Sequence, residues 1–424
     1  MHEALYTLDI LNIILDEAVL RHADLFHCAL VCSMWRYVAV PKIWEDIRST
    51  EALFGLLPKE TLDPDYDSSE GLPRALDSDN HHRVLPSGWE EFSMRTALAK
   101  RFVLDISAVP IDQQWAIAPV VSRASAFPSL RQLVIHGPLQ SEEVITVPCL
   151  SLLLLDANDR AREVASLQSI ETHRTPVSDI ISLLHLPRAR SLQSICVTGQ
   201  IANLDTLSSF IEILPSTLDV RTLRELTITR TLCASRAYGS PDRYFLTLVH
   251  LECLSVFQRL TRLEFIGVAA ASMDDAEYAQ CAAWWPELRV FVLQPPVPEA
   301  WYPGTCTLSA VEAFARECPS LELLCLPLLY ATVPRDFSSH AQVQSSTTRR
   351  PAVTIRIVDD FLASMEVSVS TQELNPLRYT RYVEDLASYL LMLFPGLERV
   401  THVGRTPADA GYHAPAAEGR QEDP

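Results

Sequence analysis

The sequence PSLRQLVI at residues 128–135 recurs as PELRVFVL at 286–293 and as PSLELLCL at 319–326. These stretches share the pattern Leu-x-x-Φ-x-Φ, in which Φ is an apolar residue, and each is preceded by Pro-x. Proline cannot continue a helix and biases the residue before it toward extended backbone, so a helix should end before each stretch and a strand should begin in it. Self-similar units at intervals of roughly 20 to 50 residues indicate a repeat architecture.

The unit starts at seven leucines that are irregularly spaced along the chain: Leu130, Leu150, Leu192, Leu223, Leu260, Leu288 and Leu321, with a weaker echo at Leu397. Helix-like apolar stretches at 204–214 and 308–318 separate the units, and strands at 101–106 and 353–357 and a helix at 379–394 extend the series. The pattern predicts an α/β fold in which an irregular leucine-rich-repeat-like solenoid has a parallel sheet with helices on its convex side. An unrelated α/β domain is the alternative.

Short helices are predicted for the first 48 residues. One apolar stripe includes Ile10, Leu11, Ile14 and Leu15, and a second runs from Leu25 to Trp35 at spacings of three and four. Pro41 fits the first position of a third helix, because its missing N–H costs nothing there. The chain then divides into a helical domain (1–48), a connecting helix and acidic linker (49–95), the repeat domain (96–404) and a disordered tail (405–424).

The N-terminal segment resembles the F-box family, particularly the F-box-like heads of many fungal proteins. The likeness spans residues 3–48, and one departure is Thr7-Leu8, which stands where the family usually has Leu-Pro or Ile-Pro. The residues that carry it are Asp9, Ile10, Leu11, Ile14, Asp24, Leu25, the stretch ALVC at 29–32, Trp35, Arg36 and Trp44.

The resemblance implies that the head binds a Skp-family adaptor, and through it a cullin, within a ubiquitin ligase, while the repeat body holds a protein substrate. Neither part of such a protein carries out bond chemistry, so no enzyme activity and no cofactor are expected. A repeat scaffold without ligase association is the alternative. The adaptor-binding residues implied by the resemblance are Leu8, Ile10, Leu11, Leu25, Leu30, Val31, Trp35 and Trp44.

The substrate face is predicted from strand geometry, because residues between inward-pointing apolar ones must point to the other side of the sheet. Four arginines on that face could grip carboxylates or a phosphorylated segment. Alternatively they pair with Glu225 and Glu264 across strands and only keep the face soluble. The predicted face includes Arg131, Gln132, Val134, His136, Arg224, Thr227, Arg262, Glu264 and Arg289.

Charge and hydropathy exclude several classes of partner. The chain carries 35 basic and 53 acidic residues, a net charge of −18, so nucleic acid should be repelled. Its apolar stretches are shorter than the roughly 18 residues of a membrane-spanning helix, so no membrane association is expected. The start lacks the features of a secretory signal and the ten cysteines are scattered, which predicts a cytoplasmic or nuclear protein without disulfides.

Common catalytic motifs are absent from the sequence, including the P-loop, Gly-x-Ser-x-Gly and His-Glu-x-x-His. Cys28 and Cys32 lie four residues apart, but no second pair follows at zinc-like spacing, so both are expected in the core and no metal site is predicted. The pair His81-His82 in the acidic linker is expected to be a solvated loop rather than a weak metal site. Trp284-Trp285 is expected to close the core rather than to stack on a ligand.

Overall fold

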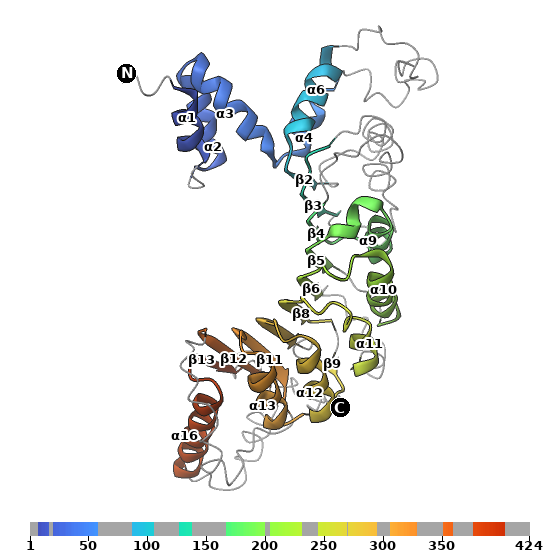
Figure 1. The fold of residues 1–424 in the computed structure, drawn as a ribbon, viewed down its shortest axis with the longest axis vertical. Helices are drawn as coiled ribbons and strands as arrows, with labels where there is room; N and C mark the ends of the chain where they lie inside the picture. The colour runs from blue at the N-terminus through green and yellow to red at the C-terminus, as the bar shows by residue number, and fades with distance from the viewer. Residues whose placement is uncertain are drawn as a thin grey trace, which may run out of the picture. The chain divides into compact units, whose positions relative to one another are not determined.

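The structure is a computed structural model with an α/β fold. It describes residues 7–16, 20–57, 87–105, 127–137, 167–199, 204–230, 245–268, 270–294, 306–328, 351–358 and 376–402. Eleven strands form one open parallel sheet in the order β1-β2-β3-β4-β5-β6-β8-β10-β11-β12-β13, which follows the order of the sequence (Figure 1). The chain divides into two compact units, unit 1 with residues 1–236 and 249–262, and unit 2 with residues 237–248 and 263–424.

Unit 1 contains the N-terminal helices and the first six strands of the sheet. Helices α9 and α10 lie on one side of its strands (Figure 1). Its helices are α1 (Leu8–Asp16), α2 (His22–Val31), α3 (Ser33–Glu45), α4 (Thr50–Phe54), α6 (Ser87–Leu98), α9 (Val177–Leu184), the 3-10 helix η5 (Pro187–Ser191) and α10 (Leu204–Thr217). Its strands are β1 (Asp46–Ile47), β2 (Arg101–Asp105), β3 (Gln132–His136), β4 (Ser169–His173), β5 (Ser194–Gly199) and β6 (Glu225–Arg230).

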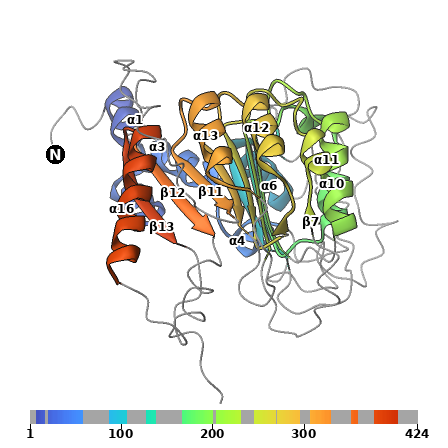
Figure 2. The ribbon, with the colours of Figure 1, turned by 90° about the horizontal axis from the view of Figure 1, so that it is seen from below.

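Unit 2 repeats the alternation of strands and helices. Helices α12 (Asp275–Trp284) and α13 (Leu308–Glu317) lie on one side of β10 and β11 (Figure 2). The remaining elements are β7 (Phe245–Leu246), α11 (Leu248–Glu252), β8 (Arg262–Ile266), β9 (Ala270–Ala271), β10 (Val290–Gln294), β11 (Leu323–Pro327), β12 (Val353–Val358), α16 (Pro376–Leu393) and β13 (Leu397–His402). α11 and β8 each have residues in both units.

The repeated leucine marks the turn before each strand. Leu130 is 2% exposed and Leu133 and Ile135 are 1% and 0% exposed, while β3 itself begins at Gln132. Six of the seven predicted units show the same relation, with strands that begin two residues after the first leucine. Those strand predictions are therefore confirmed, whereas the unit at Leu150 lies outside the described residues.

Strand β4 was not predicted. Its unit begins at Leu167 and continues with Ile170, but Thr172 stands at the last apolar position of the pattern. Thr172 is fully buried, and its hydroxyl has no hydrogen-bond partner within the described residues. A β-branched residue fits the buried face of a strand even when one of its branches is a hydroxyl. β4 lies between β3 and β5 in the sheet, within the long interval that separates Leu150 from Leu192.

The N-terminal helices differ from the prediction at two points. The second stripe is broken at Cys32, whose extended backbone (φ −164°, ψ 175°) separates α2 from α3. Pro41 lies inside α3 rather than at the start of a third helix. The helix continues through Pro41 although one backbone hydrogen bond is lost there, because Val38 and Ala39 are buried in the core of the three helices.

Aromatic side chains fill the core of unit 2. Trp285 is fully buried, with its ring centroid 6.4 Å from Phe291, which in turn lies 4.7 Å from Phe314. Trp284 makes an edge contact with Trp285 at 5.6 Å and is half-buried. The expected core position of this pair is thus confirmed for Trp285.

The cysteines of the described residues are free thiols. Burial raises the pKa of Cys281, Cys318 and Cys325 to about 12, so these thiols stay protonated and unreactive at neutral pH. Among the described residues, no helix is both long and apolar enough to cross a membrane. The same part of the chain contains no group of three or more side chains arranged to hold a metal ion, and His81-His82 lies outside it.

Candidate functional site

Exposed apolar side chains are concentrated on α1, α2 and the start of α3, which together we call the head. Of the fourteen large apolar residues found exposed in the described part of the chain, eight lie between Leu8 and Tyr37. Folded proteins seldom leave such surface open unless it binds something. The eight residues are Leu8, Ile10, Ile13, Ile14, Phe26, Leu30, Val31 and Tyr37.

The predicted adaptor-binding residues fall into two groups. Leu8, Ile10, Leu30 and Val31 are exposed, by 40%, 37%, 60% and 49% respectively. The others face inward: Leu11 is fully buried, Leu25 and Trp35 pack against the core that contains it, and the ring of Trp44 lies under the guanidinium of Arg95 at 5.4 Å. Leu11 is therefore a core residue and not a surface residue, because its stripe faces α3.

Three strongly exposed apolar residues of the head were missed by the sequence reasoning. Ile13, Phe26 and Tyr37 are 61%, 56% and 72% exposed. Ile10, Ile13 and Ile14 share one face of α1 because residues three and four apart are neighbours on a helix. For Ile13 the available signal was the width of the apolar stripe of α1, which exceeds what one small core can cover; this signal does not extend to Phe26 on α2 or Tyr37 on α3.

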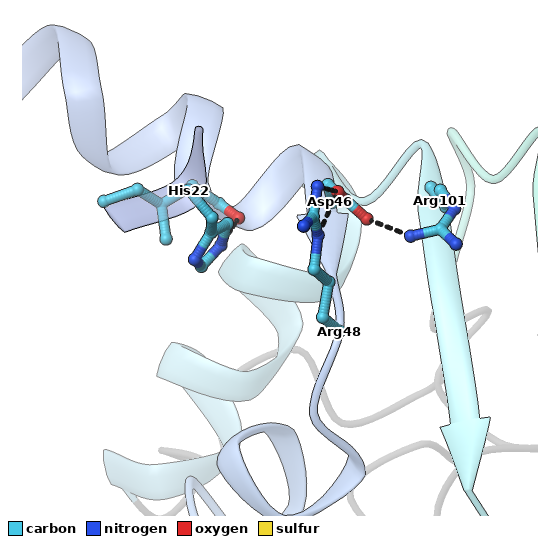
Figure 3. A network of polar contacts seen from close by, with 5 residues as sticks. His22, Asp46, Arg48 and Arg101 are labelled. Carbon is cyan, nitrogen blue, oxygen red and sulfur yellow. Dashed lines mark hydrogen bonds and ion pairs between the residues drawn. The ribbon is translucent and has the colours of Figure 1, made fainter. Parts of the chain in front are cut away.

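A polar network connects the head to the edge of the sheet (Figure 3). The carboxylate of Asp46 accepts hydrogen bonds from Arg101 Nη1 at 2.8 Å and from Arg48 Nε at 2.6 Å. Strand β1 pairs with β2, and Lys100 Nζ lies 2.9 Å from Glu45 Oε2. The end of α3 is thereby fixed to the first strands of the sheet.

Asp46 provides a test of this connection. Burial raises the pKa of Asp46, but the hydrogen bonds from Arg101 and Arg48 outweigh it, so the pKa of the folded protein lies below 3.8, the ordinary value. The Asp46→Asn variant should lower the free energy of unfolding by about 1 kcal/mol near pH 7. A carboxylate whose pKa is lower in the folded than in the unfolded protein stabilises the fold at pH values above its unfolded pKa. The stability lost in Asp46→Asn should therefore shrink as the pH falls below 3.8.

The measurement is urea unfolding of both chains at pH 7 and at pH 3. Asp205→Asn is a matched control, because Asp205 is exposed on α10 and has no ion pair with another described residue. An equal effect of Asp46→Asn at both pH values would contradict the assigned role of the carboxylate.

The side of the sheet opposite α9 and α10 carries polar side chains in unit 1, and we call it the open face. Along β3 to β6 these residues alternate with buried ones, and the parallel register aligns them in rows. The residues of the open face are Gln132, Val134, His136, Ser169, Glu171, His173, Ser194, Cys196, Thr198, Glu225, Thr227 and Thr229, and all but Val134 are exposed or half-buried.

The predicted substrate-face residues are not all equivalent in the structure. Arg131 and Arg224 are exposed, and neither forms an ion pair with a described residue. Arg289 forms an ion pair with Glu322, donating from Nε to Oε1 at 2.8 Å. An arginine of the predicted face is thus neutralised across strands, as in the alternative reading, but by Glu322 rather than by Glu225 or Glu264. Val134 is 2% exposed and belongs to the interior, since an apolar side chain gains by burial even on the polar side of a sheet.

The other predicted substrate-face residues are half-buried: His136, Thr227, Arg262 and Glu264. His136 stacks on His173, a neighbour that was not predicted because β4 was not recognised. The structure therefore brings Arg131, His136, Arg224 and Thr227 onto unit 1, whereas Arg289 lies in unit 2.

No family model matches the chain, and no curated protein is significantly similar to it in sequence.

Proposed function

We propose that the chain is the substrate-recognition subunit of a Skp-cullin-F-box type ubiquitin ligase. The head is an F-box-like, all-helical domain that binds the Skp adaptor, which links it to a cullin. The sheet with its helices is a leucine-rich-repeat-like solenoid that binds a protein substrate. Neither part performs bond chemistry, and the site of action is the cytoplasm or the nucleus.

The single observation that carries the proposal is the exposed apolar surface of the head. An adaptor that covers Ile10, Ile13, Leu30 and Val31 would remove this surface from water, which provides the main favourable free energy of association. Head and sheet are also connected through Asp46 and Arg101, so an adaptor bound to the head would hold the sheet in a defined orientation.

Thr7 fits the start of α1 although the F-box family usually has proline nearby. Its carbonyl oxygen accepts the hydrogen bond of the Leu11 N–H at 3.0 Å, so Thr7 directly precedes the helix. Threonine is one of the residues favoured at this position. The departure from the family pattern therefore leaves the helix start intact.

The proposed substrate surface is the open face of unit 1. Its hydroxyl, amide, imidazole and carboxylate groups suit the polar rim of a protein interface better than a pocket for an apolar ligand. Arg131 and Arg224 are not members of the open face but directly precede β3 and β6; both are exposed and form no ion pair within the described residues, so their guanidinium groups are available to substrate carboxylates at its margin. A repeat scaffold without ligase association would use the same face, and would differ only at the head.

Co-purification separates these two functions. The full chain, expressed with an affinity tag in cells, should recover a Skp adaptor and a cullin together. The adaptor should be present in about equal molar amount, because one head offers one apolar surface. An established F-box protein purified in parallel provides the positive control. If that control recovers the adaptor and the chain does not, the ligase function is contradicted and the scaffold function is the one that stands.

A further inference from the structure

The turns that precede β5, β6 and β8 are rich in arginine, and we call them the arginine turns: residues 187–194, 218–225 and 255–262. They contain six arginines and two carboxylates, so their net charge is 6 − 2 = +4, in a chain whose net charge is −18. The equivalent turns before β10 and β11, at 283–290 and 316–323, contain two arginines and three carboxylates, so their net charge is 2 − 3 = −1. The positive charge is thus a local feature of unit 1, to which all three arginine turns belong.

Backbone hydrogen bonds hold the arginine turns side by side. The Asp219 N–H donates to the carbonyl oxygen of Arg190 at 2.7 Å, and the Arg224 N–H donates to that of Gln193 at 2.8 Å. The Thr261 N–H donates in turn to the carbonyl oxygen of Arg224 at 2.7 Å. Because neighbouring strands of a sheet lie about 4.8 Å apart, the three turns together span roughly 10 Å across the strands.

The positive charge of these turns is largely uncompensated within the chain. Asp219 Oδ1 accepts a hydrogen bond from the backbone N–H of Arg221 at 2.9 Å, and Glu225 Oε2 accepts one from Ser194 Oγ at 3.1 Å, so neither carboxylate pairs with a guanidinium group. Unpaired like charges in neighbouring turns repel one another and do not stabilise the fold. Four arginines of the turns are exposed and form no ion pair with another described residue: Arg190, Arg221, Arg224 and Arg259.

We propose that the arginine turns bind an extended, acidic segment of the protein substrate. Charge complementarity supports an anionic occupant, and guanidinium groups bind carboxylates through two parallel hydrogen bonds. An extended chain advances about 3.3 Å per residue, so a span of roughly 10 Å matches three to four residues that run across the strands. The exposed amide side chains of Gln193 and Gln258 lie within the same turns and can donate further hydrogen bonds.

The charge of the rest of the chain favours a short protein segment over nucleic acid. A nucleic acid carries its negative charges beyond the arginine turns, where they meet a chain that is acidic overall. A short acidic segment keeps its charges within the turns, and salt at physiological concentration screens the more distant carboxylates beyond about 8 Å.

This inference rests on the proposed role of unit 1 in substrate binding, and it adds the chemistry of the bound segment. It does not depend on the adaptor. Of the four exposed arginines, Arg224 was predicted from the alternation along a strand. Arg190, Arg221 and Arg259 were not, because they lie in the turns before the strands and outside the repeated pattern.

The test measures the fluorescence anisotropy of a labelled hexa-glutamate peptide with the full chain at pH 7.5. The double variant Arg190→Gln and Arg224→Gln should bind about fivefold more weakly, the effect of two exposed ion pairs. Arg316→Gln with Arg399→Gln is the matched control, because it removes the same charge from two exposed positions outside the arginine turns and should change binding little. Circular dichroism of both variants establishes that the fold persists.

Three results would overturn the inference: no saturable binding of hexa-glutamate by the wild-type chain, equal weakening by the two double variants, or tighter binding of a single-stranded oligonucleotide of six nucleotides than of the peptide. Adaptor binding by the same preparations is measured separately. A chain that binds the adaptor but fails the peptide test disproves only the acidic-segment inference, and the reverse result disproves only the ligase function.

Discussion

Replacing Gly137 by alanine should destabilise unit 1 by about 1–3 kcal/mol. A Cβ at residue 137 would stand 2.8 Å from the carbonyl carbon of Arg174 and closer still to its oxygen. Both atoms belong to the backbone, so no side chain can rotate away. Arg174 is itself held at a left-handed φ of 59°, and the Gly137 N–H donates to the His173 carbonyl oxygen at 2.7 Å.

The same substitution should disturb the stacking of His136 on His173, because Gly137 directly follows His136 and its neighbour Arg174 directly follows His173. Gly199→Ala is the matched control at the end of β5, since a Cβ there would lie 3.4 Å from the Thr175 carbonyl oxygen, an ordinary contact. Urea unfolding of the two variants provides the comparison. Equal stability of Gly137→Ala and Gly199→Ala would show that β3 and β4 do not approach each other as closely as described.

The parallel sheet was predictable because the leading leucine and the alternating apolar residues are both written in the sequence. Leu192 and Leu223 mark β5 and β6 without ambiguity. β4 was missed because Thr172 replaces an apolar residue while remaining buried, and only the positions of β3 and β5 reveal that a strand belongs there. The break at Cys32 could not be predicted either, since the apolar spacing continues through it.

The candidate sites were less predictable than the fold. Spacing on a helix identifies an apolar stripe but not which of its members faces the interior, so Leu11 and Ile10 could not be told apart. Alternation along a strand places His136, Thr227 and Val134 on one side of the sheet, but it does not show that Val134 is buried there, because that burial depends on its neighbours. The stacking of His136 on His173 depends on the register of β3 and β4, which only the structure provides.

The largest effect on function is expected from the double variant Ile13→Gln and Leu30→Gln. These side chains are 61% and 60% exposed, so their replacement should change stability by less than about 0.5 kcal/mol. Adaptor binding should weaken at least about tenfold, because the adaptor would have to cover two polar amide groups where the wild-type chain offers apolar side chains. Val249→Gln with Leu391→Gln is the matched control, since both residues are exposed apolar residues outside the head.

Substitution is a sharper test than deletion of residues 1–48. That deletion would also remove β1 and the Asp46 carboxylate, and with them the contacts that cover the edge of β2. Loss of binding by a shortened chain could then reflect damage to the sheet. The exposed residues of the head can be changed without touching this connection.

Isothermal titration calorimetry of the purified full chain with a purified Skp adaptor tests the central claim most directly. We predict stoichiometric binding by the wild-type chain and by the Val249→Gln and Leu391→Gln control, and binding at least about tenfold weaker for Ile13→Gln with Leu30→Gln. Absence of binding by the wild-type chain, or undiminished affinity of the head variant, would contradict the account.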